Sequence, residues 1–252
     1  MRDRTSELRL AQVLVETTNT LDDDFDPEHY LGRVAGHCVE LLDASATGVI
    51  FDSAGSPSFA VGGHPHDLAL GLLSAQQNGG PCVESLGTGR PVPPVRLTED
   101  EPAARWPEFT ALARRHGIGA TYAVPVRQRE KLLGALNVFV PEAAPWSPCA
   151  DGELRLAQAI ADAAAVGLHN HRAYTRYRTL ATQLQGALTS RIRIEQAKGI
   201  LAERWHTGMD EAFDALRRYA RRERLVMDVV ATEVIKGSLD DTTLRGGWSD
   251  PS

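Results

Sequence analysis

Four arginines near the C-terminal end carry the clearest chemical signal in the sequence. Arg217, Arg218, Arg221 and Arg222 stand at positions i, i+1, i+4 and i+5, a spacing that gathers their guanidinium groups on one side of a helix. Guanidinium groups pair with phosphates and stack on unpaired bases, so this cluster is suited to contact with RNA. A solvated charged helix face is the competing interpretation, and composition alone leaves the two equally open.

The distribution of charge supports the RNA interpretation. Residues 176–236 hold 12 lysines and arginines against 8 acidic residues, a net charge of +4, whereas residues 1–175 hold 14 against 22, a net charge of −8. The whole chain has a formal net charge of −6, which argues against indiscriminate binding of polyanions. A local basic face on a small helical module is instead the electrostatic footprint of phosphate contact.

Three helices are predicted to carry this basic face. Apolar residues recur every three or four positions from Leu180 to Leu201, which predicts a helix with one apolar stripe. A second helix follows the Thr207-Gly208 turn and has acidic residues in its first turn, where carboxylates favour the helix dipole. A third apolar pattern runs from Leu225 to Ile235 and closes a three-helix unit, whose core must be thin because the unit is small.

The order of residues in these helices resembles a known signature. The run Ile194–Leu201, followed by Ala212-Phe213 and Leu216-Arg217, is similar to the ANTAR domain, a three-helix RNA-binding module of bacterial antitermination regulators. The resemblance implies that a small surface at Ala197 and Gly199 lets a loop base approach while Lys198 meets a phosphate. The full set of residues expected to bind RNA is Arg191, Arg193, Ala197, Lys198, Gly199, Arg217, Arg218, Arg221 and Arg224.

Three positions depart from the family pattern. The family usually has Gly in the turn before the second helix and Ser, Thr or Asp as its cap, where this chain has His206 and Gly208. Arg224 occupies a position that is often Asn. These departures concern the geometry of the turns more than the function.

Residues 1–170 alternate helical and strand-like patterns. Two hairpins are predicted, one from strands at 46–51 and 58–61 and one from strands at 120–126 and 132–140. Helical spacing covers residues 8–18, 30–42 and 66–77. Because parallel strands would need a crossover within each pair, the sequence predicts an α+β fold with an antiparallel sheet flanked by helices.

That order of elements, together with several short motifs, resembles a GAF domain over roughly residues 10–170. The motifs are Gly80-Pro81-Cys82, Gly89-Arg90-Pro91-Val92, Trp106-Pro107-Glu108-Phe109, Val124-Pro125-Val126 and Gly134-Ala135-Leu136-Asn137. GAF domains are sensory or dimerising modules with a pocket between sheet and helices, and the GAF–ANTAR pairing is a familiar layout of bacterial, notably actinobacterial, regulators. Known GAF ligands include cyclic nucleotides, haem and bilins. No residue selects among them, so no cofactor is identified and the ligand stays unknown.

Candidate ligand-pocket residues in this half are Cys82, Trp106 and Tyr122. A packed or inert thiol is the stronger interpretation of Cys82, because a reactive cysteine needs a basic neighbourhood. The aromatic residues are more often core than pocket lining. No metal site is predicted, since the pair His169 and His171 points to different faces of a helix.

No catalytic motif is present, so the chain is predicted not to be an enzyme. It lacks a phosphate-binding loop, a His-Glu-x-x-His zinc motif and a Gly-x-Ser-x-Gly nucleophile motif. No run of 18 apolar residues exists and the first residues lack the apolar core of a signal peptide. A cytoplasmic protein with no membrane contact is expected.

A long helix joins the two halves. Leucines and aromatic residues at spacings of three and four run through residues 151–190, which predicts a coiled-coil seam and a homodimer. A single helix packed along its own domain is the competing interpretation. The predicted domains are a GAF domain at 1–170, a helical connector at 171–190, an ANTAR domain at 191–238 and a polar tail at 239–252.

The sequence thus predicts an antitermination regulator that binds hairpin loops of RNA under the control of a sensory domain. The alternative is a small-molecule sensor whose C-terminal helices bind a protein partner or DNA. Binding to hairpin RNA but not to duplex DNA of equal charge separates these two functions.

Overall fold

The computed structural model describes residues 4–22, 24–52, 59–144 and 151–245. The chain divides into two compact units, Met1–Thr175 and Arg176–Ser252. The long helix α7 (Asp151–Trp205) contributes residues to both. No described helix has an apolar stretch long enough to cross a bilayer.

The first unit is built on a five-stranded antiparallel sheet in the order β2-β1-β5-β4-β3. The two predicted hairpins are the pairs β1–β2 and β4–β5, and they join along β1 and β5, where Val49 faces Leu136. The strands are β1 (Ala46–Asp52), β2 (Phe59–His64), β3 (Val92–Arg96), β4 (Ile118–Gln128) and β5 (Lys131–Pro141). This confirms the predicted antiparallel α+β fold.

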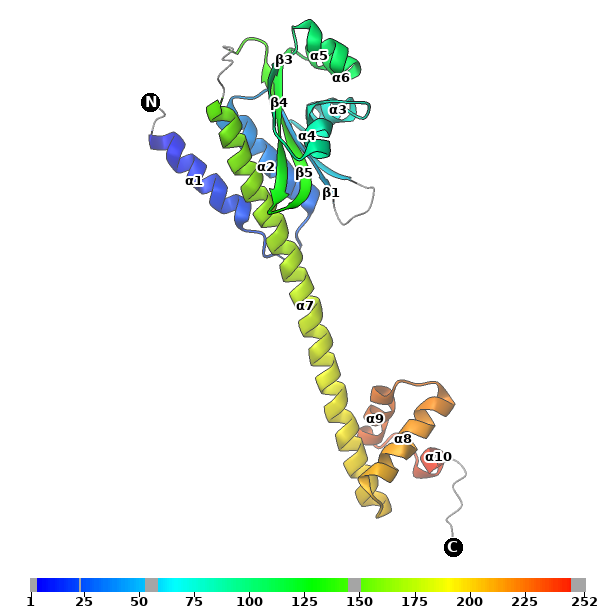
Figure 1. Ribbon diagram of the computed structural model, residues 1–252. Helices are drawn as coiled ribbons and strands as arrows, with labels where there is room; N and C mark the ends of the chain where they lie inside the picture. Colours follow the sequence, from blue (N-terminus) through cyan, green and yellow to red (C-terminus); the bar gives the residue numbers. More distant parts are fainter. Residues whose placement is uncertain (1–3, 23, 53–58, 145–150, 246–252) are drawn as a thin grey trace. The chain divides into compact units, whose positions relative to one another are not determined.

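Alternation along the strands sends side chains to two separate cores. Val49, Tyr122 and Leu136 pack with α2 (Pro27–Leu42) and the beginning of α7 on one face of the sheet. Ala123 and Phe139 pack on the opposite face with the helices that follow β2 and β3 (Figure 1). Those helices are α3 (His66–Ser74), α4 (Pro81–Thr88), α5 (Asp100–Arg105) and α6 (Pro107–Arg115). The sheet is therefore buried between two helical layers, as its nearly continuous apolar strands require.

The N-terminal helix α1 (Arg4–Thr18) is joined to this unit by polar contacts at its middle and at its C-terminal end. Arg9 and Glu40 of α2 form an ion pair of 2.8 Å. The Tyr30 hydroxyl donates a hydrogen bond of 2.7 Å to the Thr17 carbonyl. The Thr20 hydroxyl donates a bond of equal length to the carbonyl of Gly167 in α7. The end of α1 and the chain after it are thus fixed against α2 and α7.

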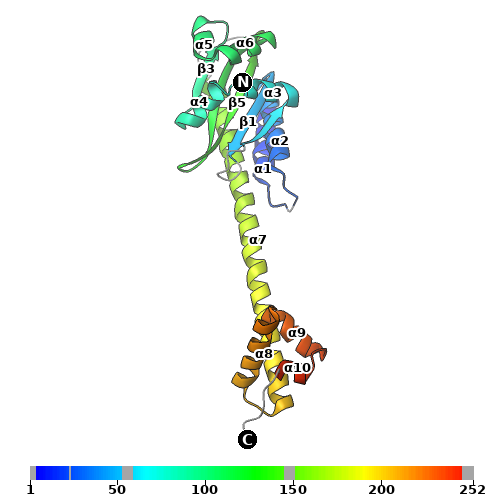
Figure 2. The same cartoon turned by 90° about the vertical axis from the view of Figure 1, so that its right-hand side faces the viewer.

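The second unit contains the end of α7 and three shorter helices, α8 (Met209–Glu223), α9 (Met227–Lys236) and α10 (Asp241–Arg245), which gather beside that end of α7 (Figure 2). The end of α7, α8 and α9 correspond to the three predicted helices. Helix α10 was not predicted, and it corrects the boundary at residue 238 because it falls in the segment predicted to be a polar tail. Leu244 is 2% exposed and joins the core of this unit.

Candidate nucleic-acid interface

An amphipathic helix presents the arginine cluster. Apolar residues of α8 face the core, where Ala212, Leu216 and Tyr219 pack against Leu201 of α7 and Val230 of α9. The basic residues follow on the outer side because they fall between these apolar positions. The core therefore fixes the direction in which the guanidinium groups leave the module.

The turns on either side of α8 use a left-handed backbone conformation. His206 has a φ of 54° and Arg224 has a φ of 56°. Glycine and asparagine adopt this conformation most readily. The turn geometry is thus the one that the family residues favour, although the side chains differ. Gly208 caps α8 without a side-chain hydrogen bond, and the Thr207 hydroxyl bonds to the Glu211 carboxylate instead.

Four of the predicted residues form a row of cations without ion pairs. Arg217 and Arg221 stand at i and i+4, so they share one face of α8, and Arg218 lies beside them. Arg224 follows directly after the helix as its C-cap residue. All four are exposed. None of the four has an ion-pair partner among the described residues. These guanidinium groups are consequently available for a phosphate or a base.

Lys198 is held more tightly than the arginines. Its side chain is only 15% exposed, and the ammonium nitrogen lies 3.0 Å from a Glu195 carboxylate oxygen. It also lies 5.4 Å from the centre of the Phe213 ring. Since Phe213 and Arg217 are four residues apart on α8, Lys198 lies on the same edge of the module as Arg217. The structure therefore brings these two predicted residues together.

The remaining predicted residues differ in their surroundings. Ala197 is fully buried, which corrects its assignment to the RNA surface, because a base cannot reach it without displacing the core. Gly199 is half-buried, with open space where a Cβ atom would lie. Arg191 is exposed, whereas Arg193 pairs with Asp228 at 2.8 Å. Arg193 therefore has part of its guanidinium engaged with a carboxylate, unlike the four arginines without ion pairs.

Two aromatic residues were not assigned to the site from the sequence. Phe213 lies under Lys198, and the Arg245 guanidinium lies 4.7 Å from the centre of the Trp205 ring. Phe213 is part of the signature run, so its contact with Lys198 could have been predicted from the sequence. The contact of Trp205 with Arg245 could not, because it depends on α10.

The three candidate pocket residues of the first unit do not meet around one cavity. Cys82 and Trp106 lie in the core between the sheet and α3–α6, whereas Tyr122 lies in the core on the opposite face of the sheet. Burial raises the pKa of the Cys82 thiol to about 12, which makes the reactive thiolate rare near neutral pH. Burial also raises the pKa of Tyr122. The grouping of the three as one ligand pocket is therefore wrong.

A different hollow opens on the α2 side of the sheet. It measures about 500 Å³ and lies between α2 and β2, with His29, Arg33 and His64 among its lining residues. Within the described ranges, no group of three histidine, cysteine or acidic side chains has an arrangement suited to a metal ion.

The comparisons with known proteins divide the chain in the same way as its structure. The GAF domain matches residues 26–168 and the ANTAR domain matches residues 182–235. No match was found among curated proteins.

Several solved structures are similar to this chain. The GAF domain of a phosphoenolpyruvate-protein phosphotransferase from Coxiella burnetii is 17% identical, covers 67% of this chain and 98% of its own, and has a TM-score of 0.45. An N-acylhomoserine lactone dependent LuxR family transcription factor from Burkholderia cenocepacia is 16% identical, covers 66% of this chain and 99% of its own, and has a TM-score of 0.48. The GAF match spans more than half of the residues and the ANTAR match follows it, so this chain belongs to the GAF family and carries an ANTAR domain after its GAF domain.

Proposed function

We propose that this protein regulates transcription antitermination by binding hairpin loops of nascent RNA through its ANTAR domain. The general kind of function is given by the two domains, one sensory and one RNA-binding. The observation that carries the finer proposal is the group of four arginines without ion pairs, three on α8 and Arg224 at its C-cap, beside Lys198 and Phe213.

This arrangement suits an RNA loop better than a duplex. Arginines contact phosphates through charge-assisted hydrogen bonds, and each such contact releases a counterion from the nucleic acid. Unpaired bases in a loop are free to stack on an aromatic ring or on a guanidinium plane. A bound loop holds its stem closed, and the stabilised hairpin excludes the competing terminator. Because nascent RNA is the target, we place the protein in the cytoplasm.

We further propose that the protein acts as a homodimer. Five apolar side chains of α7 are exposed at spacings of three and four: Tyr177, Leu180, Leu184, Leu188 and Ile192. They form one stripe on the helix. Its three leucine residues are between 49% and 63% exposed, and contact of this apolar surface with water is unfavourable. A second copy of the same stripe covers it in register, as in a coiled coil. Two ANTAR domains then bind two RNA hairpins together, which raises the affinity of the pair.

The GAF domain supplies the sensory input in this proposal. The hollow between α2 and β2 has a volume of about 500 Å³, within the usual range for a small-molecule ligand. A ligand there contacts α2, which packs in the same core as the beginning of α7. A change in that packing is the route by which the sensory domain alters the helix that carries the RNA-binding residues.

Variants of Arg217 and Lys198 test the RNA proposal. Arg217→Ala and Lys198→Ala should each weaken binding of hairpin RNA by about 1–3 kcal/mol, because each removes a charge-assisted contact. Arg204→Ala is the matched control, since it removes the same charge from an arginine that pairs with Asp241 at 2.9 Å. Fluorescence anisotropy with a labelled hairpin measures the affinities. Equal affinity of all three variants and the unchanged protein contradicts the assignment of the site.

A further inference from the structure

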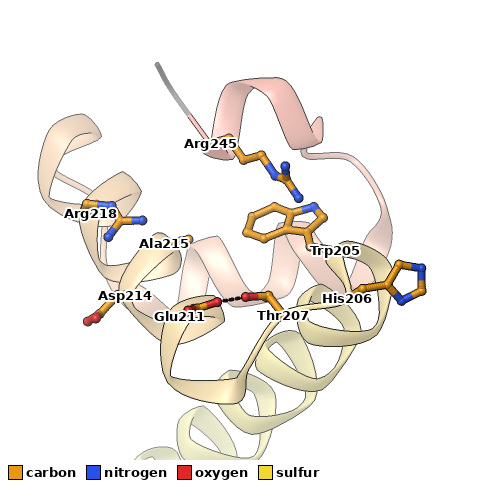
Figure 3. A pocket seen from close by; sticks show the side chains of 8 residues that line it. All are labelled: Trp205, His206, Thr207, Glu211, Asp214, Ala215, Arg218 and Arg245. Atoms are coloured by element: carbon orange, nitrogen blue, oxygen red, sulfur yellow. Dashed lines mark hydrogen bonds between the residues drawn. The ribbon is translucent and has the colours of Figure 1, made fainter. Parts of the chain in front are cut away.

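A cavity of about 330 Å³ lies at the C-terminal end of α7, where α8 and α10 meet it. In Figure 3, Trp205 and Arg218 face each other across the hollow. Glu211 and Thr207 close its lower side, and Arg245 covers the indole ring from above. The cavity is thus formed by residues from three helices, and Arg218 connects it to the row of arginines on α8.

The cavity walls carry opposite charges that form no ion pair with each other. Arg218 has no ion pair with Glu211 or Asp214, although all three side chains line the same cavity. The Glu211 carboxylate accepts a hydrogen bond from the Thr207 hydroxyl through one oxygen, and its second oxygen can accept from another donor. The cavity therefore offers a cation and hydrogen-bond acceptors to one ligand.

Trp205 forms an aromatic wall of the cavity, and one of its polar atoms is left without a partner. Its indole Nε1 atom is buried and has no hydrogen-bond partner in the part of the chain that the structure describes. A buried donor without a partner destabilises the fold. The Arg245 guanidinium lies over one face of the indole ring, 4.7 Å from its centre, and aromatic rings and guanidinium planes are the surfaces on which unstacked bases stack.

The size and the chemistry fit one nucleotide. A volume of about 330 Å³ is at the low end for ligand pockets, which excludes a helix or a duplex. A nucleotide carries a phosphate for Arg218, a ring for Trp205 and N–H groups for the Glu211 carboxylate. Trp205 and Lys198 are seven residues apart on α7, which places them about 10 Å from each other along the same side of the helix. One RNA loop spans that distance.

We propose that this cavity receives a single unstacked nucleotide of the RNA loop. It selects a base whose Watson–Crick edge offers N–H donors to Glu211, while Arg218 holds the phosphate. This inference rests on the proposed RNA binding. It adds a base-reading site at the end of α7 to the phosphate contacts of the Lys198 and Arg217 edge.

A change of base preference is the result that tests the proposal. The full chain is first used to select its tightest ligand from hairpins with a fixed stem and a randomised loop. Each loop position of that hairpin is then replaced by the other three bases, and affinities are measured for the unchanged protein, Glu211→Gln and Asp210→Asn. An amide donates as well as accepts, whereas a carboxylate only accepts. Glu211→Gln should therefore alter the preference among bases at one loop position by about 5-fold or more.

The control variants separate the outcomes. Asp210→Asn makes the same change of charge on the first turn of α8, outside the cavity, and should leave every base preference unchanged. Trp205→Leu should weaken binding of the selected hairpin at least 5-fold, and Trp205→Phe should restore part of the loss. If Trp205→Leu does not fold by circular dichroism, the Glu211→Gln comparison decides alone. Identical base preferences in Glu211→Gln and the unchanged protein overturn the proposal, whereas failure of the unchanged protein to bind any hairpin overturns the RNA function itself.

Discussion

The apolar stripe of α7 gives a prediction whose size follows from the structure. Leu180 is 49% exposed and Leu184 is 63% exposed. Full burial of a leucine side chain is worth about 1.5–3 kcal/mol, so covering the exposed half of each gains about 1 kcal/mol. The double variant Leu180→Glu, Leu184→Glu removes four such side chains from a dimer, a loss of about 4 kcal/mol. Since 1.4 kcal/mol is tenfold in affinity, the dimer should weaken about a thousandfold.

Light scattering coupled to size-exclusion chromatography measures this loss directly. The double variant should elute with the mass of a monomer at concentrations where the unchanged protein has the mass of a dimer. Thr182→Glu with Gln183→Glu is the matched control, because it adds the same two charges at exposed positions on the opposite side of α7. A dimeric Leu180→Glu, Leu184→Glu protein refutes the seam, and so does a control that dissociates equally.

Three further predictions concern the GAF domain. Cys82 should resist alkylation in the native protein near neutral pH and react once the chain is unfolded, because burial raises the pKa of its thiol to about 12. Peptide mass spectrometry in a Cys149→Ser background measures the labelling. Rapid labelling of Cys82 in the native protein contradicts the prediction. Burial lowers the pKa of His37 despite its contact with Glu16, so its stabilising contribution is present above a pH of about 6.5 and is lost as the pH falls. His37→Gln should therefore reduce the drop in Tm between about pH 7 and about pH 5, and an unchanged drop contradicts the assignment. Gly167→Ala should lower the Tm, since the new Cβ would lie 2.4 Å from the Thr17 carbonyl and the Tyr30 hydroxyl. This overlap should reduce the free energy of unfolding by about 1–3 kcal/mol. Gly186→Ala on the same helix, with open space at its Cβ, is the control and should not lower the Tm.

The sheet was predictable from the sequence where apolar strands are neighbours along the chain. Strands β4 and β5 are long, buried on both faces and joined by a short polar segment, so their hairpin follows from local pattern. Strand β3 was not predicted, because it contains Pro93 and Pro94. Proline is tolerated in a strand only at an edge or a bulge, and β3 is an edge strand with a shift in register. Its place depends on pairing with β4, which local pattern does not contain.

The candidate RNA-binding residues were also predictable only in part. The spacing of Arg217 and Arg221 places them on one side of α8 regardless of tertiary structure. The burial of Ala197 and the pairing of Arg193 with Asp228 depend on how α8 and α9 pack on α7. The Trp205 cavity depends in addition on α10, whose single buried leucine gives no periodic signal. Local spacing thus predicts which charges share a helix face, but not which of them remain without a partner.

Binding of the full-length chain to a hairpin RNA and to a duplex DNA of equal charge, followed across a range of salt concentrations, tests the central claim most directly. We predict that the RNA hairpin binds tightly at moderate salt, with an affinity that falls as salt displaces the phosphate contacts. We predict that the duplex DNA binds only weakly at low salt, because its bases are not free to stack on the module. Equal affinity for both nucleic acids at every salt concentration, or no binding of the hairpin, contradicts an RNA-loop function for the arginines of α8.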